Sequence, residues 1–195
     1  MKQLIPPFFK RNLSRFKQGM ADFVDFKNDR FAKTTITNEK LNFSLKKTQE
    51  IKPSETLESK VNNLKLGAKK IQSIIIYPQE IFSFWKTVGA PNLRNGFSKS
   101  RAIINGKLSP SAGGGLCQLS SIIYHSSLEA GLEIIERHHH SVDIYENEID
   151  RYAPLGSDST VVYGYKDLRI RNTLESPIKF EFLVQNHQIT ICIKS

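Results

Sequence analysis

The spacing of apolar residues predicts two helices in this chain. In residues 54–73, apolar side chains recur every three or four positions, which places them on one face of a helix, and Ser54 is positioned to cap the first turn. The apolar positions are Leu57, Val61, Leu64, Ala68 and Ile71. A second stripe predicts a helix from about Leu116 to Ala130. We expect it to end at Gly131, because glycine commonly follows the last helical residue.

Short apolar runs and alternating patterns predict β-strands on both sides of the second helix. Strands are expected at residues 74–77 and 100–104, and Asn105-Gly106 is a strong hairpin signal after the latter. Residues 132–137 are expected to lead as a strand into a run of histidines. In the last third we expect strands at residues 160–165, 168–172, 177–184 and 189–193, with Ile189, Ile191 and Ile193 facing the core. The pattern predicts an α+β fold in which the second helix packs on a largely antiparallel β-sheet.

Length and composition indicate one globular domain with an extension. The chain has 195 residues, of which 39% are hydrophobic and 24% charged, values typical of a soluble globular protein. Residues 51–195 form the expected domain. Residues 1–50, in which phenylalanines lie among Lys and Arg, form a basic N-terminal extension. No apolar run approaches the ~18–20 residues that span a bilayer.

The start of the chain favours a cytoplasmic location. Two prolines interrupt its short apolar stretch and no small-residue cleavage site follows, so we predict no secretory signal. The two cysteines, Cys117 and Cys192, do not make a disulfide framework, and we expect both as reduced thiols. Cys192 lies in an alternating strand pattern and is interpreted as structural.

The charge is uneven along the chain. Residues 1–110 hold 21 Lys and Arg against 8 Asp and Glu, whereas residues 111–195 hold 7 against 11. A basic front half suits an anionic partner such as a membrane surface, a polyanion or an acidic substrate, or it is simply a solvated face. Residues 13–20 fit a short amphipathic helix, either on an anionic membrane or packed on the main domain. No nucleic-acid-binding motif is present, so nucleic acid is not an expected partner.

A glycine-rich turn places a cysteine at the start of the second helix. Gly113, Gly114 and Gly115 precede Cys117 and Gln118. Unpaired N–H groups and the helix dipole favour an anion there, which is one way a cysteine pKa falls from ~8.5 to ~3.5–7.5 and the thiol becomes a nucleophile. The glycines serve either as a flexible turn or as a place where a ligand approaches the backbone closely. The run lacks the ending of a phosphate-binding P-loop.

A histidine run follows about twenty residues later. In a strand, His138 and His140 would share one face and His139 would lie on the other, so one set can face the thiol. One imidazole would act as base, oriented by Asp158 or, less suitably, by Asp143. The Gln118 amide, with backbone N–H groups, would stabilise an oxyanion.

Two other interpretations of the histidines stay open. They can be satisfied polar residues at a surface, or His138 and His140 can join Cys117 as zinc ligands. The spacing of these three residues along the chain matches no common zinc motif, and a fourth ligand is not obvious. We therefore expect neither a metal nor a cofactor.

These motifs, in this order, resemble the VanW family, which is named from vancomycin-resistance gene clusters. The resemblance covers roughly residues 50–180 and rests on Pro78 to Trp85 with Val88-Gly89, Gly113 to Ser120 with Tyr124, Gly131 to Ile134 with Arg137 and His140-Ser141, Pro154 to Asp158, and Tyr163 to Leu168. Some larger, exported relatives look like L,D-transpeptidases, which join peptidoglycan stem peptides through a cysteine acyl-enzyme. The resemblance implies Cys117 as nucleophile and His140 as base, supported by Arg137, Ser141 and Asp158.

The expected function is a cysteine-dependent acyl transferase acting on peptidoglycan-related peptides. Its catalytic residues would be Cys117, His140, Asp158 and Gln118. Its substrate-binding residues would be Gly113, Gly114, Gly115, Tyr124, Arg137 and Ser141. The alternative is a non-catalytic accessory protein that binds a cell-wall peptide or glycan and is linked to glycopeptide resistance. A third possibility is a membrane-surface accessory protein that uses residues 1–50. The order of a cysteine helix followed by strands with His and then Asp is that of papain-like folds, an analogy of fold alone.

Overall fold

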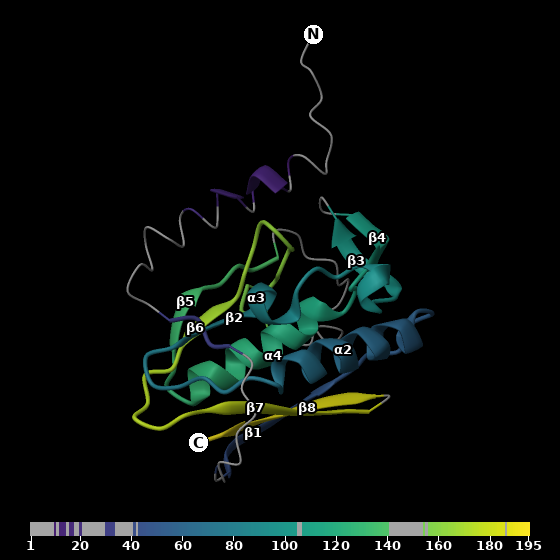
Figure 1. Cartoon of the computed structure of the whole chain (residues 1–195). Helices are drawn as coiled ribbons and strands as arrows, with labels where there is room; N and C mark the ends of the chain where they lie inside the picture. Colours follow the sequence, from purple (N-terminus) through teal and green to yellow (C-terminus); the bar gives the residue numbers. More distant parts are fainter. Residues whose placement is uncertain are drawn as a thin grey trace.

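The computed structural model describes residues 10, 12–14, 16, 17, 20, 30–33, 41, 43–104, 107–140, 154, 156–185 and 187–195. The fold is α+β, as the sequence pattern predicts. Two long helices, α2 (Leu57–Ile71) and α4 (Leu116–Glu129), lie side by side between two three-stranded antiparallel sheets (Figure 1). Among the helices of this described part, none is both long and apolar enough to cross a membrane.

The first sheet has the order β1-β8-β7 and packs against both helices. Its strands are β1 (Phe43–Glu50), β8 (Gln188–Lys194) and β7 (Lys179–Val184). The alternation predicted for the last strand is confirmed, because Ile189, Ile191 and Ile193 are buried. β1 pairs with β8 along its length. The sheet therefore begins before the domain boundary predicted at residue 51.

The second sheet has the order β2-β6-β5 and carries the chain past the histidine run. Its strands are β2 (Ile81–Ser83), β6 (Arg169–Arg171) and β5 (Glu133–Glu136), and the short helix α3 (Phe84–Val88) follows β2. A separate hairpin joins β3 (Lys99–Ile104) to β4 (Lys107–Ala112). Ile104 pairs with Lys107, as a two-residue connection requires, although residues 105 and 106 themselves lie outside the described part.

The start of α2 differs from the prediction. The helix begins at Leu57, and Ser54 does not cap it with its side chain. Thr56 occupies the N-cap position without a side-chain cap bond, because its hydroxyl instead contacts Ser100 Oγ at 3.0 Å on β3. α4 ends as predicted: the helix stops at Glu129, and Gly131 has a φ of 74°, which a glycine adopts without strain.

Two predicted strands are absent as such from the described part. In residues 74–77 only isolated bridges form, of which Ile76 pairs with Ile178. In residues 160–165 the chain turns back, so that Val162 pairs with Lys166 around Gly164, whose φ is 85°. In the first segment Ile74, Ile75 and Ile76 are buried without forming a continuous strand, whereas in the second Val161 is buried but Val162 and Tyr165 are exposed.

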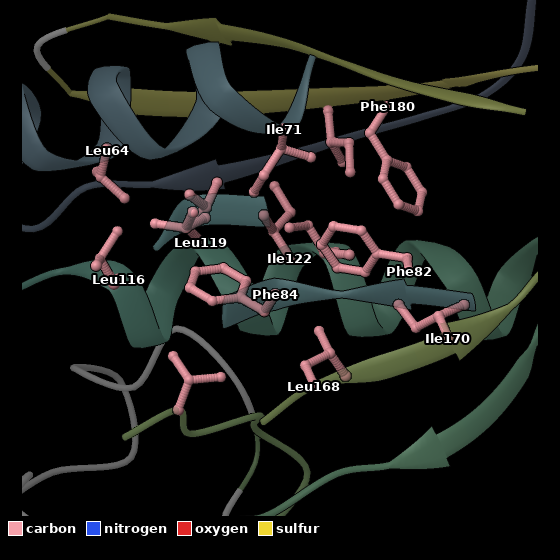
Figure 2. Packing of buried hydrophobic residues seen from close by; sticks show 14 of the residues in the cluster. Leu64, Ile71, Phe82, Phe84, Leu116, Leu119, Ile122, Leu168, Ile170 and Phe180 are labelled. Atoms are coloured by element: carbon pink, nitrogen blue, oxygen red, sulfur yellow. The ribbon is translucent and has the colours of Figure 1, made fainter. Parts of the chain in front are cut away.

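The core holds α4 from both sides. Figure 2 shows Leu116, Leu119 and Ile122 of α4 packed with residues of α2 and with three buried phenylalanines: Phe82, Phe84 and Phe180. Phe82 and Phe180 meet edge to face at 5.4 Å. Each fully buried side chain of this size contributes roughly 1.5–3 kcal/mol to folding. The first turn of α4 is therefore fixed in place by the surrounding core.

Candidate active site

The glycine turn that begins α4 is packed against the protein itself. Gly113 and Gly115 have φ angles of 85° and 99°, which other residues adopt only with strain. A Cβ on Gly114 would lie 2.6 Å from the backbone carbon of Ser100. The close approach predicted from the three glycines thus involves the backbone of β3. The turn sets the direction in which α4 begins. At Gly114 its backbone is covered by β3 and is not open to a ligand.

Cys117 is the second residue of α4 and its side chain is partly buried. Its sulfur lies 3.3 Å from the hydroxyl oxygen of Thr160 and 3.7 Å from the carbonyl oxygen of Val161. No described acceptor takes the Cys117 backbone N–H, whereas Leu116 and Gln118 donate theirs to Gly113 and Gly115. A backbone donor of the first helical turn is therefore available beside the sulfur.

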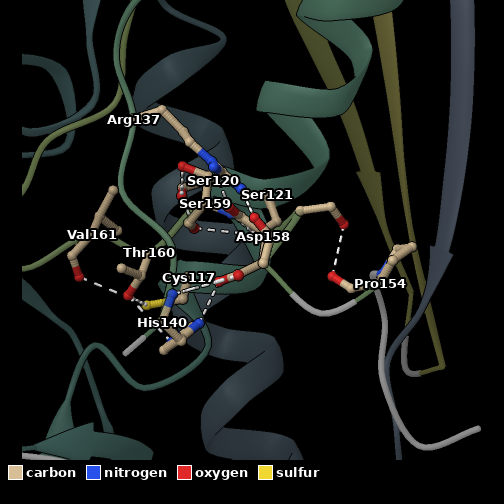
Figure 3. A network of polar contacts seen from close by, with 12 residues as sticks. Cys117, Ser120, Ser121, Arg137, His140, Pro154, Asp158, Ser159, Thr160 and Val161 are labelled. Carbon is tan, nitrogen blue, oxygen red and sulfur yellow. Dashed lines mark hydrogen bonds and ion pairs between the residues drawn. The ribbon is translucent and has the colours of Figure 1, made fainter. Parts of the chain in front are cut away.

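His140 completes a chain of polar contacts from the thiol to Asp158. Its Nε2 lies 3.2 Å from the Thr160 hydroxyl, and its Nδ1 is hydrogen-bonded to Asp158 Oδ2. The His140 backbone N–H also points at this carboxylate, 3.3 Å from Oδ2. Figure 3 shows the side chains of Cys117, Thr160 and His140 gathered together. The order is that of a nucleophile, a base and an orienting acid, with a hydroxyl between the first two.

The electrostatics of these groups favour charge separation. Burial acts to raise the pKa of the Cys117 thiol, but His140, Thr160 and Val161 outweigh it and hold that pKa below its ordinary value. Burial opposes protonation of His140, yet its hydrogen bond to Asp158 and the nearby Cys117 sulfur raise its pKa from 6.5 to about 9. Burial acts to raise the pKa of Asp158, and its bond to His140 lowers that pKa on balance. Both shifts favour a thiolate beside an imidazolium over a thiol beside a neutral imidazole.

The loop that carries Asp158 and Thr160 is fastened to α4. Ser120 and Ser121 donate their hydroxyls to the Ser159 carbonyl at 2.5 and 3.1 Å, and the Ser159 N–H donates to Ser121 Oγ at 2.8 Å. One turn further along the helix, the ring of His125 bonds the Ser157 carbonyl at 2.7 Å. The helix that holds the nucleophile therefore also holds the acid.

Arg137 also holds the loop that carries Asp158 and Thr160. Its Nε donates to the Asp158 carbonyl at 2.8 Å, and Nη2 donates to the Gly156 carbonyl. The guanidinium also lies 4.9 Å from the ring centre of Tyr124 on α4. Arg137 and Tyr124, both expected to bind substrate, are thus joined to each other and to the site loop.

The structure brings only His140 of the three histidines to the thiol. His138 bonds Glu136 at 2.9 Å, and His139 is exposed. Gln118 lies away from the sulfur: its amide donates to the Glu50 carbonyl at 2.7 Å, and the residue is 3% exposed. Ser141 and Asp143 lie outside the described residues. Within the described part, no group of three His, Cys, Asp or Glu is placed to hold a metal ion.

Thr160 is the site residue that the sequence did not reveal. The sequence pattern places it in an expected strand. Alternate residues of an extended chain share a face, and Thr160 follows Asp158 by two, so the spacing did contain a signal. Ser120 and Ser121 also gave a signal. They interrupt the apolar face of α4 and are fully buried, and buried hydroxyls need partners.

Comparison with known proteins identifies relatives over most of the domain. A family model described as "VanW like protein" matches residues 59–194. The uncharacterized protein YoaR of Bacillus subtilis (strain 168) is 36% identical over 121 residues, 62% of this chain and 38% of that protein. The vancomycin B-type resistance protein VanW of Enterococcus faecalis (strain ATCC 700802 / V583) is 38% identical over 116 residues, 59% of this chain and 42% of that protein. The matched part thus covers about two fifths of each relative. No solved structure matches the chain significantly.

Proposed function

Because this chain belongs to the VanW-like protein family, we propose that it is a cysteine-dependent acyl transferase acting on peptidoglycan-related peptides. The observation that carries the proposal is the contact chain from the Cys117 sulfur through Thr160 and His140 to Asp158. This order, with a lowered thiol pKa and a raised imidazole pKa, suits covalent catalysis by sulfur.

In the first half-reaction, the Cys117 thiolate attacks a carbonyl carbon of the donor peptide, and a carbon–sulfur bond forms. The carbonyl oxygen takes up the negative charge, and the free Cys117 N–H at the start of α4 is placed to donate to it. The carbon–nitrogen bond then breaks. The leaving amine takes the proton of the His140 imidazolium, which leaves a thioester on Cys117 and a neutral imidazole.

In the second half-reaction, the amine of an acceptor peptide attacks the thioester carbonyl. The neutral His140 accepts a proton from this amine, the carbon–sulfur bond breaks, and the thiolate–imidazolium pair is restored. Asp158 holds Nδ1 protonated, so that Nε2 is the nitrogen that exchanges protons.

The proposal that the substrate is a peptidoglycan-related peptide is supported by sequence similarity and by the chemistry of the site. One relative is named a vancomycin resistance protein, and a thiolate with a nearby acid suits exchange of one amide for another in a short peptide. Trapping the acyl-enzyme tests the proposal. The protein is incubated with an N-acetylated tetrapeptide that ends in D-alanine, and its intact mass is measured.

We expect a mass increase equal to the peptide minus its terminal amino acid, located on Cys117 by peptide mapping. Cys117→Ala should abolish the increase, while the matched control Cys192→Ala should keep it. Wild-type protein that binds the peptide but never gains this mass would contradict the proposal.

The alternative, a non-catalytic protein that binds a cell-wall peptide or glycan, makes the opposite prediction for the sulfur. Under it, Cys117→Ala leaves peptide affinity and biological effect intact. Titration calorimetry with the same tetrapeptide, combined with the mass measurement, separates the two functions.

A further inference from the structure

Two cations that make no ion pair within the described residues lie beside the first turn of α4. Lys60 projects from α2, and Arg101 lies on β3. The Lys60 side chain crosses the start of α4, since a Cβ on Gly115 would lie 2.8 Å from Lys60 Cγ. Gly115 is only two residues before the nucleophile. The cluster therefore borders the site without belonging to the Cys117–His140–Asp158 chain.

Thr56 joins the two elements that carry these charges. Its carbonyl accepts the Lys60 N–H at 2.9 Å, and its hydroxyl contacts Ser100 Oγ at 3.0 Å and the Arg101 N–H at 3.4 Å. The buried Asn63 amide adds a bond to the Gly114 carbonyl at 2.9 Å. The start of α2, strand β3 and the glycine turn thus hold Lys60 and Arg101 near one another.

The described residues one turn from Lys60 and opposite Arg101 are uncharged. Residues one turn from Lys60 on α2 are Thr56, Leu57, Asn63 and Leu64, and Pro110 pairs with Arg101 across the hairpin. Burial and the charge of Arg101 lower the pKa of Lys60 from 10.5 to about 8. The positive end of the α4 dipole adds to this repulsion. Such an arrangement is electrostatically costly unless an anion joins it.

The anion is not the catalytic thiolate. His140, Thr160 and Val161 are the groups that lower the pKa of the Cys117 thiol, and Lys60 and Arg101 are not among them. A second negative group, one supplied by the substrate, fits beside the reacting carbon.

We propose that Lys60 and Arg101 form a carboxylate subsite that binds a free carboxylate of the acyl substrate next to the carbonyl attacked by Cys117. This inference rests on the proposed function and specifies its substrate: a peptide with a free carboxylate beside the reacting amide. A guanidinium and an ammonium close enough to repel one another are well suited to share a carboxylate.

Alkylation with a matched pair of reagents tests the subsite without acyl transfer. Iodoacetate carries a carboxylate, and iodoacetamide is its neutral counterpart. The second-order rate constants for Cys117 are measured with both in a Cys192→Ala background at pH 7. We expect Lys60→Met and Arg101→Gln each to lower the iodoacetate-to-iodoacetamide ratio by about three- to tenfold, because each removes one attractive charge. The iodoacetamide rate should stay within twofold.

Lys65→Met is the matched control, because Lys65 is an exposed lysine on a different face of α2. It should leave the ratio unchanged. Arg101 is exposed, so its replacement does not depend on core packing. An unchanged ratio in Arg101→Gln and Lys60→Met would overturn the subsite, whereas an ordinary iodoacetamide reactivity in the wild type would instead count against the proposed function.

Protection from iodoacetamide identifies the anion. N-acetyl-D-alanine should slow alkylation in the wild type and not in Arg101→Gln, and its amide, which lacks the carboxylate, should protect neither. Protection by inorganic phosphate in the absence of protection by N-acetyl-D-alanine would overturn the carboxylate assignment in favour of a phosphate site.

Discussion

At the scale of single residues, the hydroxyl of Thr160 connects the thiol to the imidazole. It lies 3.3 Å from the Cys117 sulfur and 3.2 Å from His140 Nε2, and Thr160 is 5% exposed. A hydroxyl can donate and accept at once. It can therefore stabilise the thiolate while accepting from the imidazolium, and a proton can pass through it.

Replacing this hydroxyl by a methyl group tests its role. Thr160→Val keeps the shape and removes both contacts, so we expect acyl transfer to fall about 10²-fold and the pKa of the thiol to rise. Thr160→Ser should restore both properties. A Thr160→Val protein with wild-type transfer and an unshifted alkylation profile would show that the hydroxyl is a packing contact only.

The shifted pKa values define a pH window for activity. The thiol loses its proton below its ordinary pKa, and the raised pKa of His140 keeps the imidazolium protonated up to about 9. Acyl transfer should therefore rise through the lowered thiol pKa and fall as pH passes about 9, where the leaving amine loses its acid. The profile of kcat/KM against pH measures both limbs. In Asp158→Asn the alkaline limb should move to lower pH.

At the scale of elements, the position of the first turn of α4 depends on how α2 and β3 hold the glycine turn at residues 113–115. Asn63 is buried and makes three bonds with its amide: to the Gly114 carbonyl, the Ser98 carbonyl and the Ser98 N–H. The bond to the Gly114 carbonyl is buried, and the two bonds to Ser98 are partly buried. A single side chain on α2 thus fixes the entry into α4.

Asn63→Ala should destabilise the protein by about 2–4 kcal/mol, because it leaves buried and partly buried backbone groups without partners. Its exposed neighbour Asn62 also bonds Ser98 and Gly96, so Asn62→Ala is a matched control and should cost less than about 1 kcal/mol. Urea unfolding measures both values. Equal losses of unfolding free energy in the two variants would show that the Asn63 bonds to the glycine turn add no stability beyond that of a surface hydrogen bond.

At the scale of the whole molecule, the sequence predicts the α+β class, the two long helices and the final strands, because their periodicity is local. It does not reveal β1, whose pairing with β8 joins residues more than a hundred positions apart. Cys117, His140 and Asp158 are found from residue type and order. Thr160 is not, because hydroxyl residues are common and only the folded loop brings this one between sulfur and ring.

The basic extension makes a prediction for the whole chain. If residues 1–50 bind an anionic membrane surface, the 195-residue chain should float with phosphatidylglycerol vesicles and not with phosphatidylcholine vesicles. Replacing Lys10, Arg11, Arg15 and Lys17 by glutamine should weaken binding by about 1 kcal/mol per residue. Equal flotation of the variant and the wild type would reject this role for the extension.

The most direct test of the central claim is the rate of Cys117 alkylation by iodoacetamide as a function of pH, measured in a Cys192→Ala background with and without His140→Ala. We predict a wild-type inflection below the ~8.5 of a free cysteine and a return toward that value once His140 is replaced. An inflection at the ordinary thiol pKa in both proteins would contradict that claim.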